Sequence, residues 1–341
     1  MNAFCLCPRV IIRAHMPMTI DSLGKRYIKR HVAPTFKEIG KRKKQLCAPL
    51  EPVRSSFLEW NYDAEIYAFN QRLTEKFDSK LLVRALTHRS YVVQQENEER
   101  KVGIEDHQIT IDDNQELINV GSTLTSKIVK IYLSLALPRA PKECIQACHD
   151  HLLTEEVLAR SSLLIGTKDI ILTEESPPLQ STLANTFLAL VAALSKSTNE
   201  VHAGKFVRDF ILMTLTERDL AELWCPENPI KILNKILANE TKEPVEPRLI
   251  TQCGVNSVLP AYQIALYSKK EYLAEGIETS VEKAMRVASL NALYDMFGIS
   301  SSSKPIAANI IVDPSSNPVE NLPLNEWCTR NATKLMEKRS V

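Results

Sequence analysis

The sequence lacks an uninterrupted hydrophobic run long enough to cross a bilayer. The apolar stretch from Ile128 to Leu137 is broken by Lys130, and the stretch from Asn185 to Leu194 has only ten residues, whereas a membrane-spanning helix needs about 20. Paired cysteine spacing is also missing, because the eight cysteines are scattered along the chain. The composition therefore predicts neither a transmembrane segment nor a disulfide framework, and the cysteine usage indicates a reducing compartment.

The whole chain has almost no net charge: the formal value is +1. The charged residues are nevertheless distributed unevenly along it. Residues 1–50 hold eleven Lys or Arg against two acidic residues, a net of +9, which leaves −8 for the other 291. Such asymmetry is typical of a targeting sequence, a nucleic-acid-binding tail, or both. Residues 1–20 carry Arg9 and Arg13 among apolar residues and contain no acid, so we expect a mitochondrial presequence there.

Residues 21–56 form a second basic segment. Its most concentrated part is the run Lys41, Arg42, Lys43 and Lys44. We expect these side chains to contact RNA phosphates, since phosphate attraction dominates protein–RNA affinity. The alternative is a solvated extension, and the two are compatible.

Residues 57–224 have the pattern of an all-helical domain. Ile66, Phe69, Leu73 and Phe77 recur at intervals of three and four residues, which predicts one helix packing one face. Asp78 and Ser79 are expected to cap a second helix that contains Leu82, Leu86 and the segment Ala85–Tyr91. Further helical periodicity covers residues 115–135, 140–164, 180–196 and 203–222.

Pro226 and Pro229 mark a boundary, after which the pattern changes. The fold class we expect is mostly α: an all-helical domain followed by a small α+β domain over residues 226–299, in the order α-β-β-β-α. Residues 300–341 are rich in Ser and Pro and predict an extended tail, apart from a short helix near 325–338. The expected elements of the second domain are Ile230–Asn239, Arg248–Cys253, Ala261–Ser268, Glu271–Gly276 and Ser280–Phe297.

Two segments carry a resemblance to a known family. Ala85–Tyr91 (ALTHRSY) is similar, residue for residue, to a segment near the start of ribonuclease III domains. Asn114–Ser122 (NQELINVGS) follows the register of that family's acidic helix through Asn114, Leu117 and Gly121. The second acidic pair of the family, Asp and Glu spaced by three, aligns with Asn185 and Leu188 in the stretch Leu183–Leu188. The resemblance implies that the metal-binding acidic positions are occupied here by Gln115, Ile118, Ser122, Asn185 and Leu188.

None of those five residues is a carboxylate, although positions 115, 118 and 122 would share one helical face. Magnesium prefers hard, anionic oxygen ligands, and a two-metal site needs carboxylates to neutralise it. Glu116 lies about 100° off that face. We therefore expect a ribonuclease III-like pseudo-nuclease without catalytic residues, bound metal or cofactor.

Within the superfamily, the segments Glu59–Ile66 and Asn114–Leu117 are similar to the mitochondrial ribosomal branch. This resemblance extends over residues from about 57 to 300. That resemblance implies a structural role in the large subunit of the mitochondrial ribosome, in the mitochondrial matrix. The partners it implies are large-subunit rRNA, neighbouring ribosomal proteins and a second ribonuclease III-like chain through the 115–135 helix. Two alternatives stay open: an active RNA-processing endonuclease that borrows carboxylates, and a free duplex-RNA adaptor.

The order α-β-β-β-α resembles a double-stranded-RNA-binding domain. Residues 280–286 match that family's lysine-bearing motif in frame, but only Lys283 and Arg286 are basic, and the family's loop histidine falls on Val258. Residues 226–300 hold eight basic and nine acidic residues. Weak duplex binding is therefore expected, with Lys283 and Arg286 as the remaining candidates.

Cys144, Cys148, His149 and His151 cluster within eight residues and invite comparison with a zinc site. Structural zinc sites usually draw ligands from two separated pairs, and the histidines would point away from the cysteine face of one helix. We predict buried cysteines beside surface histidines.

Overall fold

The structure is a computed structural model and describes residues 33–45, 54, 59–102, 112–299, 309–315 and 320–340. The expected presequence at residues 1–20 lies outside them. The chain divides into two units, Met1–Leu58 and Glu59–Val341. Within the first unit, Ala33–Gln45 forms helix α2, which the sequence pattern did not predict; Pro34 sits in its first turn, where a missing N–H costs nothing.

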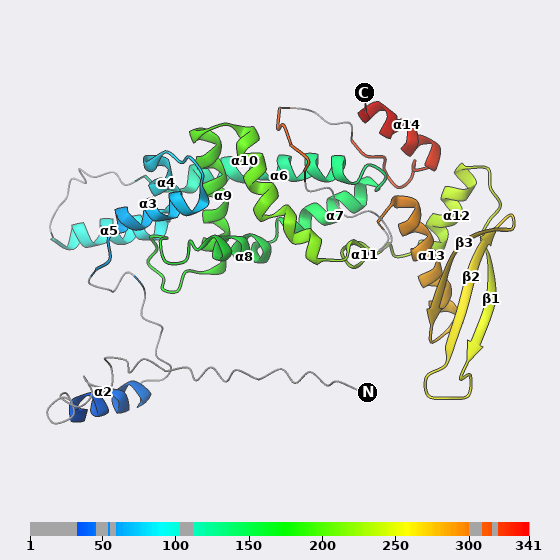
Figure 1. The fold of residues 1–341 in the computed structure, drawn as a ribbon, viewed down its shortest axis with the longest axis horizontal. Helices are drawn as coiled ribbons and strands as arrows, with labels where there is room; N and C mark the ends of the chain where they lie inside the picture. The colour runs from blue at the N-terminus through cyan, green and yellow to red at the C-terminus, as the bar shows by residue number, and fades with distance from the viewer. Residues whose placement is uncertain are drawn as a thin grey trace, which may run out of the picture. The chain divides into compact units, whose positions relative to one another are not determined.

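The second unit begins with a helical domain, as expected (Figure 1). Its elements are α3 (Tyr62–Leu73), α4 (Ser79–Leu86), α5 (Arg89–Val102), α6 (Gln115–Ala136), α7 (Lys142–Leu152), α8 (Glu155–Ile165), α9 (Gln180–Ser197), α10 (Glu200–Phe210), the 3-10 helix η2 (Leu212–Glu217) and α11 (Leu220–Leu223).

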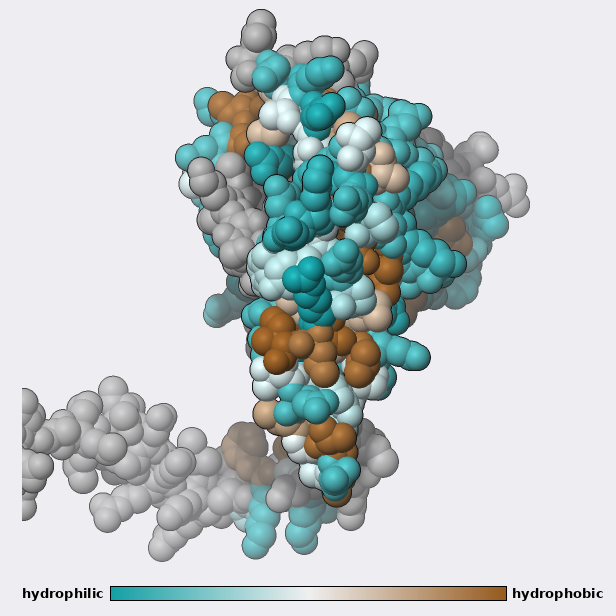
Figure 2. All heavy atoms as spheres, turned by 90° about the vertical axis from the view of Figure 1, so that its right-hand side faces the viewer, coloured by the Kyte–Doolittle hydropathy of each residue, from teal (hydrophilic) through white to brown (hydrophobic). Residues whose placement is uncertain are grey.

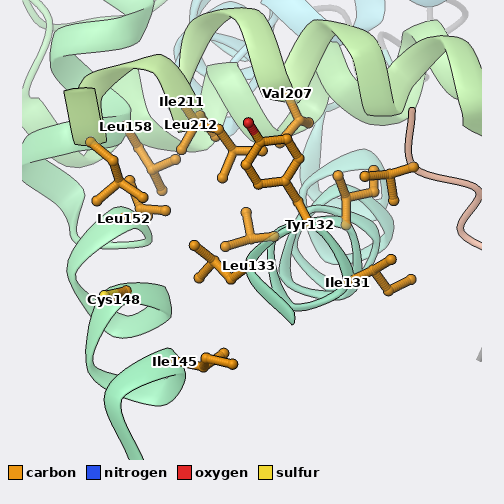
Figure 3. Close-up of a cluster of buried hydrophobic side chains, with 14 of the residues drawn as sticks. Ile131, Tyr132, Leu133, Ile145, Cys148, Leu152, Leu158, Val207, Ile211 and Leu212 are labelled. Carbon is orange, nitrogen blue, oxygen red and sulfur yellow. The ribbon is translucent and has the colours of Figure 1, made fainter. Parts of the chain in front are cut away.

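Helix α9 forms the centre of this domain. Its residues from Thr186 to Leu194 are all buried, and it packs against α4, α6, α8 and α10. A helix that is apolar on every side must be enclosed by its neighbours. Phe187 of α9 stacks on Phe206 of α10 with ring centroids 5.8 Å apart. Figure 3 shows how α6, α7 and α8 add their apolar side chains to the same core.

Four helix predictions need correction. The stretch 203–222 is not one helix, because α10 is followed by the 3-10 helix η2 and then by α11. The first predicted helix ends at Leu73, because Thr74 adopts a left-handed conformation, and Phe77 is buried from the following loop. The segment 85–91 is broken at Thr87, which pairs with Leu172 in an isolated bridge. The stretch 140–164 is two helices, since Leu153 and Thr154 separate α7 from α8.

The sheet domain follows, with α12 (Pro229–Asn239), β1 (Glu246–Cys253), β2 (Ala261–Ser268), β3 (Glu271–Glu278) and α13 (Val281–Phe297). The strands form an antiparallel sheet in the order β1-β2-β3. Small residues let α13 lie close to it: Ala284 and Ala288 are fully buried, and a β-carbon at Gly276 would stand 2.5 Å or less from a backbone atom of each. This confirms the expected α-β-β-β-α order.

The C-terminal tail is packed rather than simply extended. In its described part, Val312, Asn321 and Trp327 are buried. The predicted short helix is α14, which spans Thr329–Ser340 and so begins four residues later than expected. Among the described residues, no helix combines the length and apolar character required to cross a membrane.

Candidate functional site

The site suggested by the sequence lies where α6 crosses α9. Helix α6 runs unbroken from Gln115, so residues 115, 118 and 122 share a face as predicted. Asn114 precedes the helix and is 1% exposed, and its Nδ2 donates to the carbonyl oxygen of Ala85 at 3.3 Å. This bond fixes the start of α6 against α4.

Gly121 and Leu188 bring the two helices together. A β-carbon at position 121 would stand 1.9 Å from the backbone oxygen of Leu188. Only glycine permits this approach. The close packing of α6 on α9 therefore depends on Gly121, one of the residues through which α6 resembles the acidic helix of the family.

The five degenerate positions differ in environment. The side chains of Gln115 and Ser122 are exposed, Ile118 and Asn185 are half-buried, and Leu188 is buried. Ile118 packs against the core. In the part of the chain that the structure describes, no hydrogen bond joins the amide of Gln115 or Asn185 to another side chain.

The five degenerate positions supply few side chains that could bind a metal ion. The five positions offer two amides, one hydroxyl and two hydrocarbon side chains, and none carries a negative charge. Magnesium is held by carboxylates and other hard oxygen donors, so these residues do not fit it. Across the described ranges, no group of three or more His, Cys, Asp or Glu side chains is arranged to hold a metal ion.

Glu116 is the carboxylate closest in sequence to these positions, and its oxygens are already paired. Arg84 of α4 lies 2.8 Å from one oxygen and Lys196 of α9 lies 3.2 Å from the other. The hydrogen bonds from Arg84 and Lys196 hold the pKa of Glu116 below its usual value. The residue thus joins α4, α6 and α9 by charge.

His88, in the segment that resembles the family, lies in a hydrogen-bonded junction. Its backbone N–H donates to the oxygen of Leu172, and its Nδ1 lies 2.8 Å from Oγ of Ser90. Ser90 in turn contacts Oγ1 of Thr173 at 3.2 Å. The segment therefore ties the entry of the domain to the loop after α8.

The cluster on α7 differs from its prediction in one respect. Cys144 and Cys148 are buried, as expected, and the hydrogen bond between their thiols together with burial raises the pKa of Cys144. His149 was expected at the surface but is only 7% exposed. Its Nε2 contacts Oγ of Ser126 on α6 at 2.9 Å, so a packing bond accounts for its position. Figure 3 places Cys148 among apolar side chains.

The candidate RNA-binding residues lie in two separate units. Lys283 and Arg286 are exposed on α13, with the acidic Glu282 beside them. Lys41 and Arg42 are exposed on α2, where Arg42 lies 3.7 Å from Glu38. Lys43 and Lys44 belong to the same helix, but their side chains lie outside the described residues.

Sequence reasoning missed the contacts that the tail makes with both domains. Trp327 is 1% exposed; its Nε1 donates to the oxygen of Arg139 at 2.8 Å, and its ring meets Phe297 of α13 edge to face at 4.7 Å. The amide of Asn321 donates to the oxygens of Leu137 and Ala140. Trp327, the one aromatic residue of the sequence from 300 to 341, was the available signal for this docking.

The tail also lies along α12, the first helix of the sheet domain. Nζ of Lys235 donates to Oδ1 of Asn325 at 2.8 Å. Near the end of α12, Glu240 accepts hydrogen bonds from the backbone N–H and the hydroxyl of Thr329. One lysine of α12 is therefore engaged by the protein itself.

Comparison with known proteins gives the same picture for both domains. The family described as "Large ribosomal subunit protein mL44, endonuclease domain" matches residues 61–194, and "MRPL44 dsRNA-binding domain" matches residues 224–328. A Caenorhabditis elegans protein named large ribosomal subunit protein mL44 is 29% identical over 304 residues, covering 86% of this chain and 75% of the relative. The Neurospora crassa protein of that name is 27% identical over 130 residues, covering 38% of this chain and 29% of the relative.

Two solved structures are similar to parts of the chain. The nuclease domain of ribonuclease III from Campylobacter jejuni is 20% identical with a TM-score of 0.37, covering 43% of this chain and 96% of that one. Dicer from Pichia stipitis is 15% identical with a TM-score of 0.35, covering 64% of this chain and 94% of that one.

Proposed function

We propose that this chain, which belongs to the family of large ribosomal subunit protein mL44, is a structural constituent of the mitochondrial large ribosomal subunit and has no nuclease activity. It works in the mitochondrial matrix, to which residues 1–20 direct it. Its two folded domains act as a structural scaffold and as a docking surface during ribosome assembly and translation.

The observation that carries the loss of nuclease activity is the composition of the α6–α9 crossing. Hydrolysis by two metal ions needs ligands that neutralise the ions and hold them against the substrate. Gln115, Ser122 and Asn185 supply neutral donors, while Ile118 and Leu188 supply hydrocarbon. Glu116 does not replace a ligand, because Arg84 and Lys196 occupy its oxygens.

The sheet domain supports a fixed position in an assembly better than free duplex binding. The strand-connecting loop carries Val258 where the related domains carry histidine, and Lys283 and Arg286 stand beside Glu282. Lys235 of the first helix bonds to Asn325 of the tail. The loop and the last helix therefore lack basic residues at positions that related domains use for RNA, and one of the two lysines of the first helix is engaged by the tail.

The proposed partners are large-subunit rRNA and neighbouring ribosomal proteins. Helix α2 presents Lys41 and Arg42, together with Lys37, as exposed basic side chains suited to phosphate. A second ribonuclease III-like chain remains a proposed partner for α6. The apolar side chains that α6 could offer to such a partner are Val120, which is 38% exposed, and the half-buried Ile118 and Leu124. Leu117 is buried in the core.

Sedimentation tests the proposed place in the ribosome. Lysed mitochondria are run on gradients at high salt, and the endogenous protein is followed by immunoblotting. We expect it to travel with large subunits. Recovery only in the soluble fractions would reject a structural role.

A cleavage assay tests the proposed loss of activity separately. Purified protein is incubated with duplex RNA and Mg²⁺ or Mn²⁺, beside the same protein carrying Glu116→Gln. We expect no cleavage by either. Cleavage that disappears in the variant would establish the competing function, an RNA-processing endonuclease.

A further inference from the structure

The loop between β1 and β2, residues 254–260, carries the most exposed hydrophobic side chain among those described. Val258 is 98% exposed and Leu259 is 78% exposed, while Val255 is 48% exposed. Single exposed hydrophobic residues are common on protein surfaces. Three within five residues of one loop are unusual enough to indicate an interaction site.

Hydrogen bonds within the loop hold it in a defined shape. The backbone N–H of Ser257 donates to the oxygen of Gly254 at 2.8 Å, and the Ser257 hydroxyl donates to the same oxygen at 2.7 Å. Gly254 has a φ of +61°, which glycine adopts without strain. The turn therefore presents Val258 and Leu259 from a preorganised base, which lowers the entropic cost of binding.

The charge pattern argues against RNA as the partner of this loop. No charged residue occurs from Leu249 to Ser268, a stretch that contains most of β1, the loop and all of β2. The nearest charged cross-strand neighbour is acidic, because Glu278 of β3 pairs with Tyr262. RNA binding depends on cations that displace counterions from phosphates, and the loop and the strand segments Leu249–Cys253 and Ala261–Ser268 that flank it carry none.

Exposed apolar residues continue along β1. All eight residues of this strand are exposed, including Leu249 at 52% and Ile250 at 49%. The strand pairs only with β2, so its other edge is unpaired within the described residues. Figure 2, which faces this end of the protein, shows hydrophobic residues gathered between hydrophilic regions. From Leu249 to Cys253 this edge carries no charged residue, and an exposed apolar strand edge is normally covered in a finished assembly.

We infer that Val258 and Leu259 insert into an apolar pocket of a neighbouring protein in the large subunit. The inference rests on the proposed function and adds the class of partner for the sheet domain. A projecting apolar tip on a fixed turn fits a concave apolar surface, and two buried aliphatic side chains supply a hot spot of the usual kind. In this proposal, the loop position that contacts RNA in related domains contacts protein instead.

Two charged variants separate the classes of partner. In cells that lack the endogenous protein, we compare wild type, Val258→Glu with Leu259→Glu, and Val258→Lys with Leu259→Lys. Both variants should lower the amount recovered in isolated large subunits by roughly tenfold or more, because either charge must be desolvated in an apolar pocket. Ile311→Glu, at a residue 61% exposed in the tail, is the matched control and should change nothing.

The remaining outcomes overturn the inference. Loss with Glu but not with Lys would indicate RNA beside the loop, and full recovery of both variants would mean that nothing binds there. Crosslinking from a photoreactive residue at position 258 should label protein and not rRNA. Unchanged unfolding temperatures of the purified variants exclude misfolding as the cause. If wild type itself fails to travel with large subunits, the proposed function fails instead.

Discussion

Gly121 of α6 lies directly against the backbone oxygen of Leu188 in α9, at a distance that leaves no space for a side chain: an added β-carbon would stand 1.9 Å from that oxygen. Gly121→Ala should therefore push the two helices apart. Because overpacking a tight core typically costs about 1 to 3 kcal/mol, we expect at least that loss in the free energy of unfolding. Urea denaturation measures it.

Ser122→Ala is the matched control, since Ser122 is the next residue of α6 and its side chain is exposed. An exposed helical substitution should change stability by no more than about 0.5 kcal/mol. Equal stability of the two variants would contradict the close approach of α6 and α9.

The ion pairs of Glu116 predict a pH-dependent stability. Arg84 and Lys196 lower the pKa of this carboxyl from its usual 4.5 in the folded chain. A lowered folded pKa gives stability that is present well above pH 4.5 and is lost as the pH falls toward the lowered value. Glu116→Gln should consequently lower the unfolding temperature near pH 7 and have little effect once the carboxyl of the wild type is protonated.

Salt provides the control for that experiment. Glu116 is exposed, so added salt should screen its two ion pairs and narrow the difference between wild type and Glu116→Gln. A difference that persists unchanged at acid pH and in high salt would assign Glu116 a role other than ion pairing.

The order of elements could be predicted from the sequence because it depends on local patterns. Apolar periodicity located α6 and α9, and Asn114, Leu117 and Gly121 held the alignment of α6 with the acidic helix of the family. Contacts between residues far apart in sequence could not be predicted in this way. Thr87 leaves the helical conformation to pair with Leu172, and no pattern near Thr87 indicates that partner.

Burial of polar side chains was hard to predict for the same reason. On its own helix, His149 belongs to a polar stretch, and only Ser126 of α6 explains why it is enclosed. The candidate site is simpler, because the missing carboxylates are a property of the residues themselves. Their identities at positions 115, 118, 122, 185 and 188 set the ligand chemistry before any geometry is known.

Duplex binding by the isolated protein should be weak and insensitive to its candidate lysine and arginine. Lys283 and Arg286 lie on a domain whose basic and acidic residues nearly cancel, so replacing both by alanine removes little attraction. We expect weak binding at physiological salt and less than about a threefold change in Kd for Lys283→Ala with Arg286→Ala. Fluorescence anisotropy with a duplex of about 16 base pairs measures it. Tight, salt-sensitive binding that the double variant abolishes would favour a free duplex-RNA adaptor.

The tail should contribute substantially to the stability of the folded unit through Trp327. Its ring is almost fully buried against Phe297 of the sheet domain, and its N–H bonds to Arg139 of the helical domain. Trp327→Ala removes both contacts and leaves a large cavity, so we expect a loss of about 3 to 5 kcal/mol in the free energy of unfolding. Trp327→Phe keeps an aromatic ring and should lose less. Asn331→Ala, at an exposed position of α14, is the control.

Because Trp327 contacts both domains, the wild type should unfold in one denaturant transition and Trp327→Ala in two. A single transition in the variant, at the same denaturant concentration as in the wild type, would mean that the tail does not couple the domains.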